Sequence, residues 1–177
     1  MATVYLGLGS NLSPQANLSL AIGELSKRYG ELTISAAYRS AAVGFRGEDF
    51  LNLVVRLQTE ESPLAICDEI EVIHNLAGRV RGSDKWESRA LDIDLLLYND
   101  LVKDERPIRV PRDDILRYRF VLRPLAELAP DTIHPVTGRT MLEHWQEFDA
   151  SGHPLEIVSI DWQDSLVSRS SVHHLPE

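Results

Sequence analysis

The stretch RALDIDLLLY, residues 89–98, constrains the fold more than any other part of the chain, because it places two acids inside an apolar strand. Side chains alternate between the faces of a strand, so Asp92 and Asp94 share one face, with Cα atoms roughly 6.5 to 7 Å apart. Burying an unpaired carboxylate costs far more free energy than strand propensity returns. We therefore expect a positive group between these two aspartates.

The distribution of charge along the chain indicates where that positive group comes from. The net charge of −9 argues against general nucleic-acid binding. Residues 79–123, however, hold 11 of the 18 Lys and Arg residues but only nine of the 27 Asp and Glu residues. A salt-bridged surface is one explanation, and charge alone leaves it open. The other is a local site for a polyanion.

Length and composition predict a single globular domain. The chain has 177 residues, of which 44% are hydrophobic and 25% charged. It has no run of about 18 apolar residues and no basic, apolar leader, so we expect a cytoplasmic protein without a membrane span or secretory signal. Cys67 is the only cysteine, which excludes an internal disulfide. We expect a monomer that binds neither nucleic acid nor membranes.

Periodicity and capping signals predict the order of the elements. Ser13 as the cap, Pro14 at the first position and Gly30 after the end indicate a helix over 13–30. A second helix, over 62–78, carries apolar residues at helical spacing: Leu64, Cys67, Ile70, Ile73 and Leu76. Strands are predicted over 3–9, 32–40, 50–60 and 89–98, a polar loop over 79–89, a hairpin over 99–111, short helices over 112–130 and a helix over 140–148.

The order β, α, β, β, α, β predicts a ferredoxin-like α+β fold. In this arrangement helices cover one face of an antiparallel sheet and the other face is available for a ligand. We assign residues 1–149 to this catalytic domain. Residues 150–177 would form a C-terminal extension, with an added strand over 155–162 and a partly disordered polar tail.

The 16 residues from Arg79 to Asp94 combine several groups that suit one ligand. They contain cations, a tryptophan and both aspartates: Arg79, Arg81, Lys85, Trp86, Arg89, Asp92 and Asp94. Magnesium prefers one or two carboxylates completed by water and phosphate oxygens, and arginine binds phosphate bidentately. This combination predicts a magnesium–nucleotide site for phosphoryl transfer. Asp–Arg pairing without any metal is the alternative.

Three segments resemble the hydroxymethyl-dihydropterin pyrophosphokinase family: GRVRGSDKWESRALDIDLLLY, YLGLGSNL and DFLNLVVRLQT. The resemblance extends over residues 3–148. It implies an α+β ferredoxin-like fold, two magnesium ions and ATP as co-substrate. It also implies that pyrophosphate moves from ATP to the hydroxymethyl oxygen of 6-hydroxymethyl-7,8-dihydropterin, with release of AMP, in folate biosynthesis.

The resemblance assigns roles at the nucleotide side of the site. Asp92 and Asp94 would bind both magnesium ions. Arg79 and Arg89 would hold the ATP phosphates and stabilise charge on the transferred group, with Arg81 as a further contact. Such preorganised positive charge supplies most of the rate enhancement in this kind of reaction, without a protein nucleophile.

The resemblance also assigns the residues that bind the pterin. The Asn52 amide, with both a donor and an acceptor, would bind the edge of the ring. Phe50 and Phe120 would enclose the ring, although ordinary core packing is the simpler explanation for both. Ser40 and Val43 would line the same side of the site. Trp86 would close over the substrates from the polar loop.

Four positions depart from the family pattern, and they bear on substrate and activity. Glu87 precedes Ser88 where Gly-Pro is usual, and Ala41 stands in the loop that usually reads Thr-Pro-Pro. His74 replaces a usual Glu. Arg112 replaces a usual His, and its permanent charge preserves phosphate binding. These departures leave open a diverged member that acts on another pterin, or one that binds nucleotide or pterin without catalysis.

Overall fold

The computed structural model describes residues 1–42, 47–78, 91–149, 151–152, 154–160, 167–169 and 175. Seven strands in these residues form one sheet, and its main path runs β5 (Asp92–Tyr98), β1 (Ala2–Ser10), β4 (Phe50–Thr59), β2 (Leu32–Ile34) and β9 (Val167–Arg169). Strand β3 (Ala37–Ser40) also pairs with β4, and β8 (Glu156–Val158) pairs with β3. All pairs are antiparallel except β2–β9. The predicted α+β fold with an antiparallel sheet is confirmed.

The strand predicted over 32–40 is divided in two, because its backbone leaves the regular ladder at Ser35. The Ser35 N–H donates to the Val54 carbonyl at 3.0 Å. The Val54 N–H in turn donates to the Ser35 hydroxyl at 2.9 Å, so a side-chain oxygen replaces a backbone carbonyl. The Ala36 N–H donates to Glu127 Oε1 at 2.9 Å. Residues 35–36 therefore separate β2 from β3.

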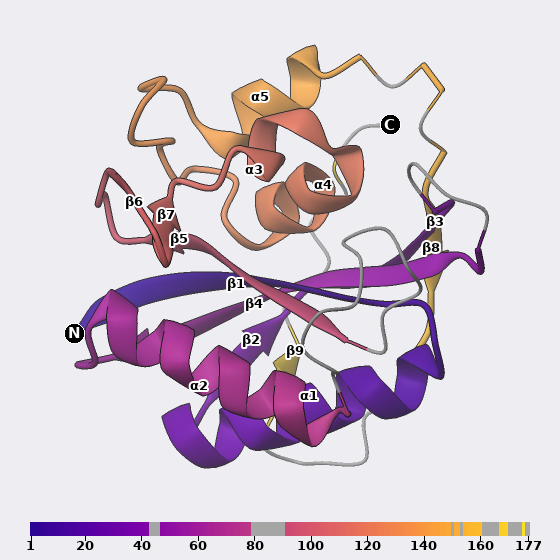
Figure 1. The fold of residues 1–177 in the computed structure, drawn as a ribbon. Coiled ribbons are helices and arrows are strands. Elements are labelled where there is room, and N and C mark those ends of the chain that lie inside the picture. Colours follow the sequence, from indigo (N-terminus) through magenta and orange to yellow (C-terminus); the bar gives the residue numbers. More distant parts are fainter. Residues whose placement is uncertain are drawn as a thin grey trace.

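Helices lie on both faces of the sheet, so the face that we expected to be available for a ligand is covered in part (Figure 1). Helices α1 (Pro14–Tyr29) and α2 (Pro63–Leu76) lie on one face. On the other face α3 (Asp114–Arg117), α4 (Arg119–Leu128) and α5 (Met141–Glu147) enclose a second core. There Leu122 and Trp145 pack with Tyr5, Val54 and Leu96 of the sheet. The predicted hairpin is present as β6 (Lys103–Glu105) and β7 (Ile108–Val110).

The buried side of α2 differs from the predicted one. Leu64 and Leu76 are 49% and 57% exposed, whereas Ile66, Ile70 and Ile73 are buried. A helix turns about 100° per residue, so residues spaced by three move steadily around its surface. Leu64 and Leu76 consequently lie on opposite sides of the direction in which Ile70 points. The predicted apolar face was too wide, because it was read at a spacing of three alone.

The C-terminal residues add to the same sheet. Strand β8 lies inside the predicted strand 155–162, and Ile160 belongs to the first core. Leu175 packs against the second core, beside Val121 and Phe148. The boundary between residues 149 and 150 stays a prediction. None of the helices in the described ranges is long and apolar enough to cross a membrane.

Candidate active site

Register brings the predicted site residues of three neighbouring strands into one row. Gly9 of β1 pairs with Asp92 of β5 on one side and with Asn52 of β4 on the other. Two strand spacings separate Asp92 from Asn52, or about 10 Å between Cα atoms. Ile93 and Leu51, their neighbours, point into the first core. Both polar side chains therefore point to the opposite face, beyond the part that α4 covers.

Glycine at the middle of this row lets side chains of the neighbouring strands lie close to the β1 backbone. A Cβ atom on Gly9 would lie 2.7 Å from Asn52 Oδ1, closer than real Cβ contacts. A Cβ atom on Gly7, two residues earlier and beside Asp94, would lie 3.3 Å from the Leu96 side chain. We call this Cβ-free position at Gly9, between Asp92 and Asn52 and bordered by the Asn52 amide, the glycine gap. The sequence signal for it is the pair of glycines two residues apart in YLGLGSNL, since residues at this spacing share one face of a strand.

The pterin-side residues are partly brought together. Asn52 is 8% exposed, and its Nδ2 donates to the Ser40 hydroxyl at 3.0 Å, which orients the amide. Phe50 follows the same face two residues earlier on β4. Phe120, at the start of α4, stacks on Tyr118 with ring centroids 5.1 Å apart. Neither Phe50 nor Phe120 is among the described side chains of the two cores, which weakens the core-packing explanation.

Arg112 is the cation beside the aspartates. Its Nη2 lies 3.1 Å from Asp94 Oδ1, and its Nε lies 3.4 Å from Asp114 Oδ2. Burial alone lowers the pKa of Arg112, but the nearby carboxylates of Asp94, Asp114 and Asp92 raise it above the ordinary value. The Arg112 N–H also donates to the Leu96 carbonyl at 3.0 Å, which fixes the residue against β5. The expected positive group is thus provided at Asp94 by the side chain that replaces the usual histidine.

A pocket of about 270 Å³ adjoins these charges on the outer edge of β5. It is lined by α2, β5 and the residues around β7, including Cys67, Glu71, His74, Asp92, Asp94 and Arg112. His74 is 2% exposed and so forms part of the wall. The charged groups that line it are four carboxylates and two guanidinium groups, those of Asp68, Glu71, Asp92, Asp94, Arg109 and Arg112. Carboxylates bind magnesium and guanidinium groups bind phosphate, so the pocket contains both kinds of group that a magnesium–nucleotide needs.

The donor set at the aspartates fits magnesium only if a substrate supplies further oxygens. Among the described residues, no three His, Cys, Asp or Glu side chains are grouped as ligands for a metal ion. Asp94 is partly exposed at 29%, which leaves its carboxylate accessible to an ion. Two carboxylates completed by phosphate and water oxygens are a common magnesium environment. The aspartates therefore suit a metal that arrives with a nucleotide.

Several predicted residues lie outside the described ranges. These are Val43, Arg79, Arg81, Trp86, Glu87 and Arg89. Their assigned roles remain predictions. Ala41 is described and exposed, directly after Ser40 at the end of β3.

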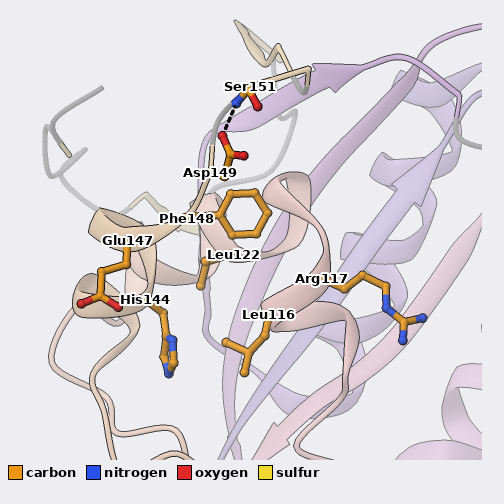
Figure 2. Close-up of a pocket in the computed structure, with 8 residues that line it drawn as sticks. All are labelled: Leu116, Arg117, Leu122, His144, Glu147, Phe148, Asp149 and Ser151. Carbon is orange, nitrogen blue, oxygen red and sulfur yellow. Dashed lines mark hydrogen bonds between the residues drawn. The ribbon is translucent and has the colours of Figure 1, made fainter.

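A second pocket, of about 440 Å³, lies among α3, α4 and α5 and contains none of the predicted site residues. Figure 2 shows His144 and Glu147 from α5 at this pocket, with Leu116 from α3 nearby and Arg117 extending away from both. Glu147 is bound by Arg139 in a bidentate pair, and His144 contacts the Thr137 hydroxyl at 2.7 Å. Glu147 and His144 therefore have partners within the protein.

Comparison with known proteins identifies relatives of this arrangement. The profile of the family "7,8-dihydro-6-hydroxymethylpterin-pyrophosphokinase (HPPK)" matches residues 5–130. A "2-amino-4-hydroxy-6-hydroxymethyldihydropteridine pyrophosphokinase" from Haemophilus influenzae is 39% identical over 140 residues, covering 76% of this chain and 86% of the relative. The protein of that name from Aquifex aeolicus is 36% identical over 145 residues, covering 81% and 90%.

A solved structure supports the fold. The HPPK-DHPS protein of Plasmodium falciparum, crystallised with pteroate, superposes with a TM-score of 0.65 at 15% identity. The match covers 82% of this chain and 42% of that one, so this chain corresponds to less than half of it. At this identity the likeness concerns the fold alone.

Proposed function

The chain belongs to the 7,8-dihydro-6-hydroxymethylpterin-pyrophosphokinase family, and we propose that it transfers pyrophosphate from ATP to 6-hydroxymethyl-7,8-dihydropterin in folate biosynthesis. The observation that carries this proposal is the row Asp92–Gly9–Asn52. This row supports the proposal because the Asp92 carboxylate and the Asn52 amide lie on one face, with the glycine gap between them.

The two substrates enter this row from opposite sides. The nucleotide binds in the 270 Å³ pocket at the edge of β5, with its phosphates toward Asp92, Asp94 and Arg112. The pterin lies over the glycine gap, and its edge meets the oriented amide of Asn52. The hydroxymethyl group then points along the row toward the phosphates. This positioning reduces the entropy cost of bringing two substrates into line.

The reaction is a displacement at phosphorus. The hydroxymethyl oxygen bonds to the β-phosphorus of ATP, the bond from that phosphorus to the α,β-bridging oxygen breaks, and AMP leaves with the oxygen. The hydroxyl proton passes to solvent. Magnesium, in the two-ion form that the resemblance implies, supplies charge neutralisation at the phosphates when Asp92 and Asp94 hold it. Arg112 exchanges its contact with Asp94 for a phosphate oxygen.

Formation of AMP from ATP tests this proposal directly. We expect AMP only when magnesium and 6-hydroxymethyl-7,8-dihydropterin are both present, from a monomer in a cytoplasmic setting. The Asp92→Ala and Asp94→Ala variants should remain folded and lose this turnover. Binding of ATP and the pterin without AMP formation would refute catalysis and support the binding-only alternative.

A further inference from the structure

His74 is a buried histidine attached to the backbone between the two candidate metal ligands. It lies in the last turn of α2 and is 2% exposed. Its Nε2 accepts a hydrogen bond from the Ile93 N–H at 2.9 Å. Its Nδ1 lies 3.2 Å from Glu71 Oε1, one turn earlier in α2. Because Ile93 separates Asp92 from Asp94, His74 holds the segment from which both carboxylates project.

These two contacts determine the protonation state of the ring. A backbone N–H can only donate, so Nε2 must carry a lone pair. The neutral ring then has its proton on Nδ1, where it donates to the Glu71 carboxylate. Glu71 is largely exposed on its helix, with 57% of its side chain accessible. His74 thus provides an acceptor to β5 without adding a charge beside the aspartates.

The position of β5 in the sheet explains why an acceptor is needed there. Within the described ranges β5 is an edge strand that pairs with β1 alone. N–H groups of an antiparallel strand point alternately toward and away from the partner, and that of Ile93 points away from β1, toward His74. A buried N–H without an acceptor is destabilising, because it has lost its bond to water and gained none in return. His74 replaces the missing neighbouring strand at this single position.

We propose that His74 is a positioning residue that fixes Asp92 and Asp94 for metal binding. The proposal rests on the proposed function, since it takes these aspartates as the magnesium ligands. With β1 on one side and His74 on the other, the backbone at Ile93 is held from both edges. Without His74 the outer edge of β5 keeps the Arg112 bond at Leu96 but loses the bond at Ile93, between the two carboxylates. Loss of a group that orients metal ligands typically lowers metal affinity about 10–100-fold.

The matched variants are His74→Phe and His74→Gln. Phe fills a similar volume but has no acceptor, whereas Gln places Oε1 as many bonds from Cα as Nε2 is. Mn²⁺ affinity is measured by calorimetry in the presence of α,β-methylene ATP. We expect His74→Phe to weaken Mn²⁺ binding about 10–100-fold and His74→Gln to retain most of it. Equal loss in both variants, or no loss in His74→Phe, overturns the proposal.

Hydrogen exchange at the Ile93 amide provides a second readout, which needs neither metal nor turnover. We expect faster exchange in His74→Phe and near wild-type protection in His74→Gln. If His74→Phe does not fold, Glu71→Leu tests the orientation of the ring instead, because it removes the carboxylate that accepts the Nδ1 proton. Unchanged Ile93 exchange and Mn²⁺ affinity in that variant overturn the proposal. Absence of AMP formation in the wild-type protein, by contrast, would refute the proposed function. The metal-binding and exchange measurements would still test the role of His74, because neither needs turnover.

Discussion

At the scale of single residues, absent side chains shape the site as much as present ones. The glycine gap exists because Gly9 has no Cβ to meet Asn52 Oδ1. The Asn52 amide is in turn oriented by its bond to Ser40. On the nucleotide side, Arg112 links Asp94 to Asp114. The contacts of Gly9 with Asn52 and of Arg112 with Asp94 join residues distant in sequence, and each yields a specific prediction.

Gly9→Ala should weaken pterin binding at least about tenfold, because a Cβ at 2.7 Å displaces the Asn52 amide and disturbs a buried hydrogen-bond network. Affinity for the ATP analogue should change little. Calorimetric titration with each ligand measures both effects. Gly23→Ala is the matched control, since a Cβ there meets nothing within 4 Å. Unchanged pterin affinity in Gly9→Ala would exclude the glycine gap as the pterin site.

Arg112→Gln should have opposite effects on the two nucleotide-side ligands. Without the guanidinium, Asp94 loses a competing cation, so Mn²⁺ should bind the nucleotide-free protein more tightly. The ATP analogue should bind more weakly, because a phosphate contact is lost. Calorimetry measures both affinities. Arg139→Gln, which removes the pair with Glu147 outside the 270 Å³ pocket, should leave Mn²⁺ affinity unchanged. Weaker Mn²⁺ binding in Arg112→Gln would contradict this account.

At the scale of elements, helices attach to the sheet through different kinds of contact. Helix α2 relies on Ile66, Ile70 and Ile73 in the first core, together with the His74 bond to β5. Helix α4 uses a buried acid, Glu127, which is 1% exposed. Glu127 accepts from the Ala36 N–H and the Tyr38 hydroxyl, where β2 gives way to β3. The break between β2 and β3 is therefore hydrogen-bonded to α4, which lies on the face of the sheet opposite α1 and α2.

Truncation to alanine should cost very different amounts of unfolding free energy at Ile73 and at Leu76, two apolar residues of α2 that differ in burial. Ile73→Ala removes a fully buried side chain and should cost about 2–5 kcal/mol of unfolding free energy. Leu76→Ala removes a side chain that is 57% exposed and should cost roughly 0.5 kcal/mol or less. Urea denaturation measures both values. Similar costs for the two variants would mean that the exposed end of α2 is covered in solution.

Glu127→Leu should destabilise the protein by about 3–5 kcal/mol, as expected when one partner of a buried polar network is removed. It leaves the Ala36 N–H and the Tyr38 hydroxyl without their acceptor. Urea denaturation measures the difference, with Glu105→Ala as the control because that side chain is 79% exposed. Burial and the bond to Glu127 raise the pKa of Tyr38 to about 12, so its titration should shift toward ordinary values in the variant. An unaltered Tyr38 titration would exclude this network.

At the scale of the whole molecule, the second face of the sheet is divided between packing and function. Toward one end of the strands, Tyr5, Val54 and Leu96 are covered by α4 and α5. Toward the other end, the same strands present Gly9, Asn52 and Asp92. One sheet thereby provides both a rigid core and a ligand-binding row. The C-terminal strands extend it beyond β2 and β3, and β8 continues this row, because Tyr38 of β3 pairs with Asn52 on one side and with Ile157 on the other.

Removal of residues 150–177 should leave a folded protein of lower stability. The deletion takes away Ile160, a buried core side chain worth roughly 1.5–3 kcal/mol, while β1, β4 and β5 keep their pairings. Thermal unfolding and binding of the ATP analogue measure stability and the site separately. An unfolded truncated chain would show that these residues belong to the domain and not to an extension.

The sequence by itself determined the local features. Alternation along 89–98 predicted two aspartates on one face, and caps with periodicity predicted the helices, because both signals depend on neighbours along the chain. Only the tertiary structure decided which residues meet. It paired Arg112 with Asp94, set His74 against Ile93, opened the glycine gap beside Asn52 and closed half of the second face with α4. Register and packing depend on contacts between distant segments, and a single sequence does not specify these by local pattern.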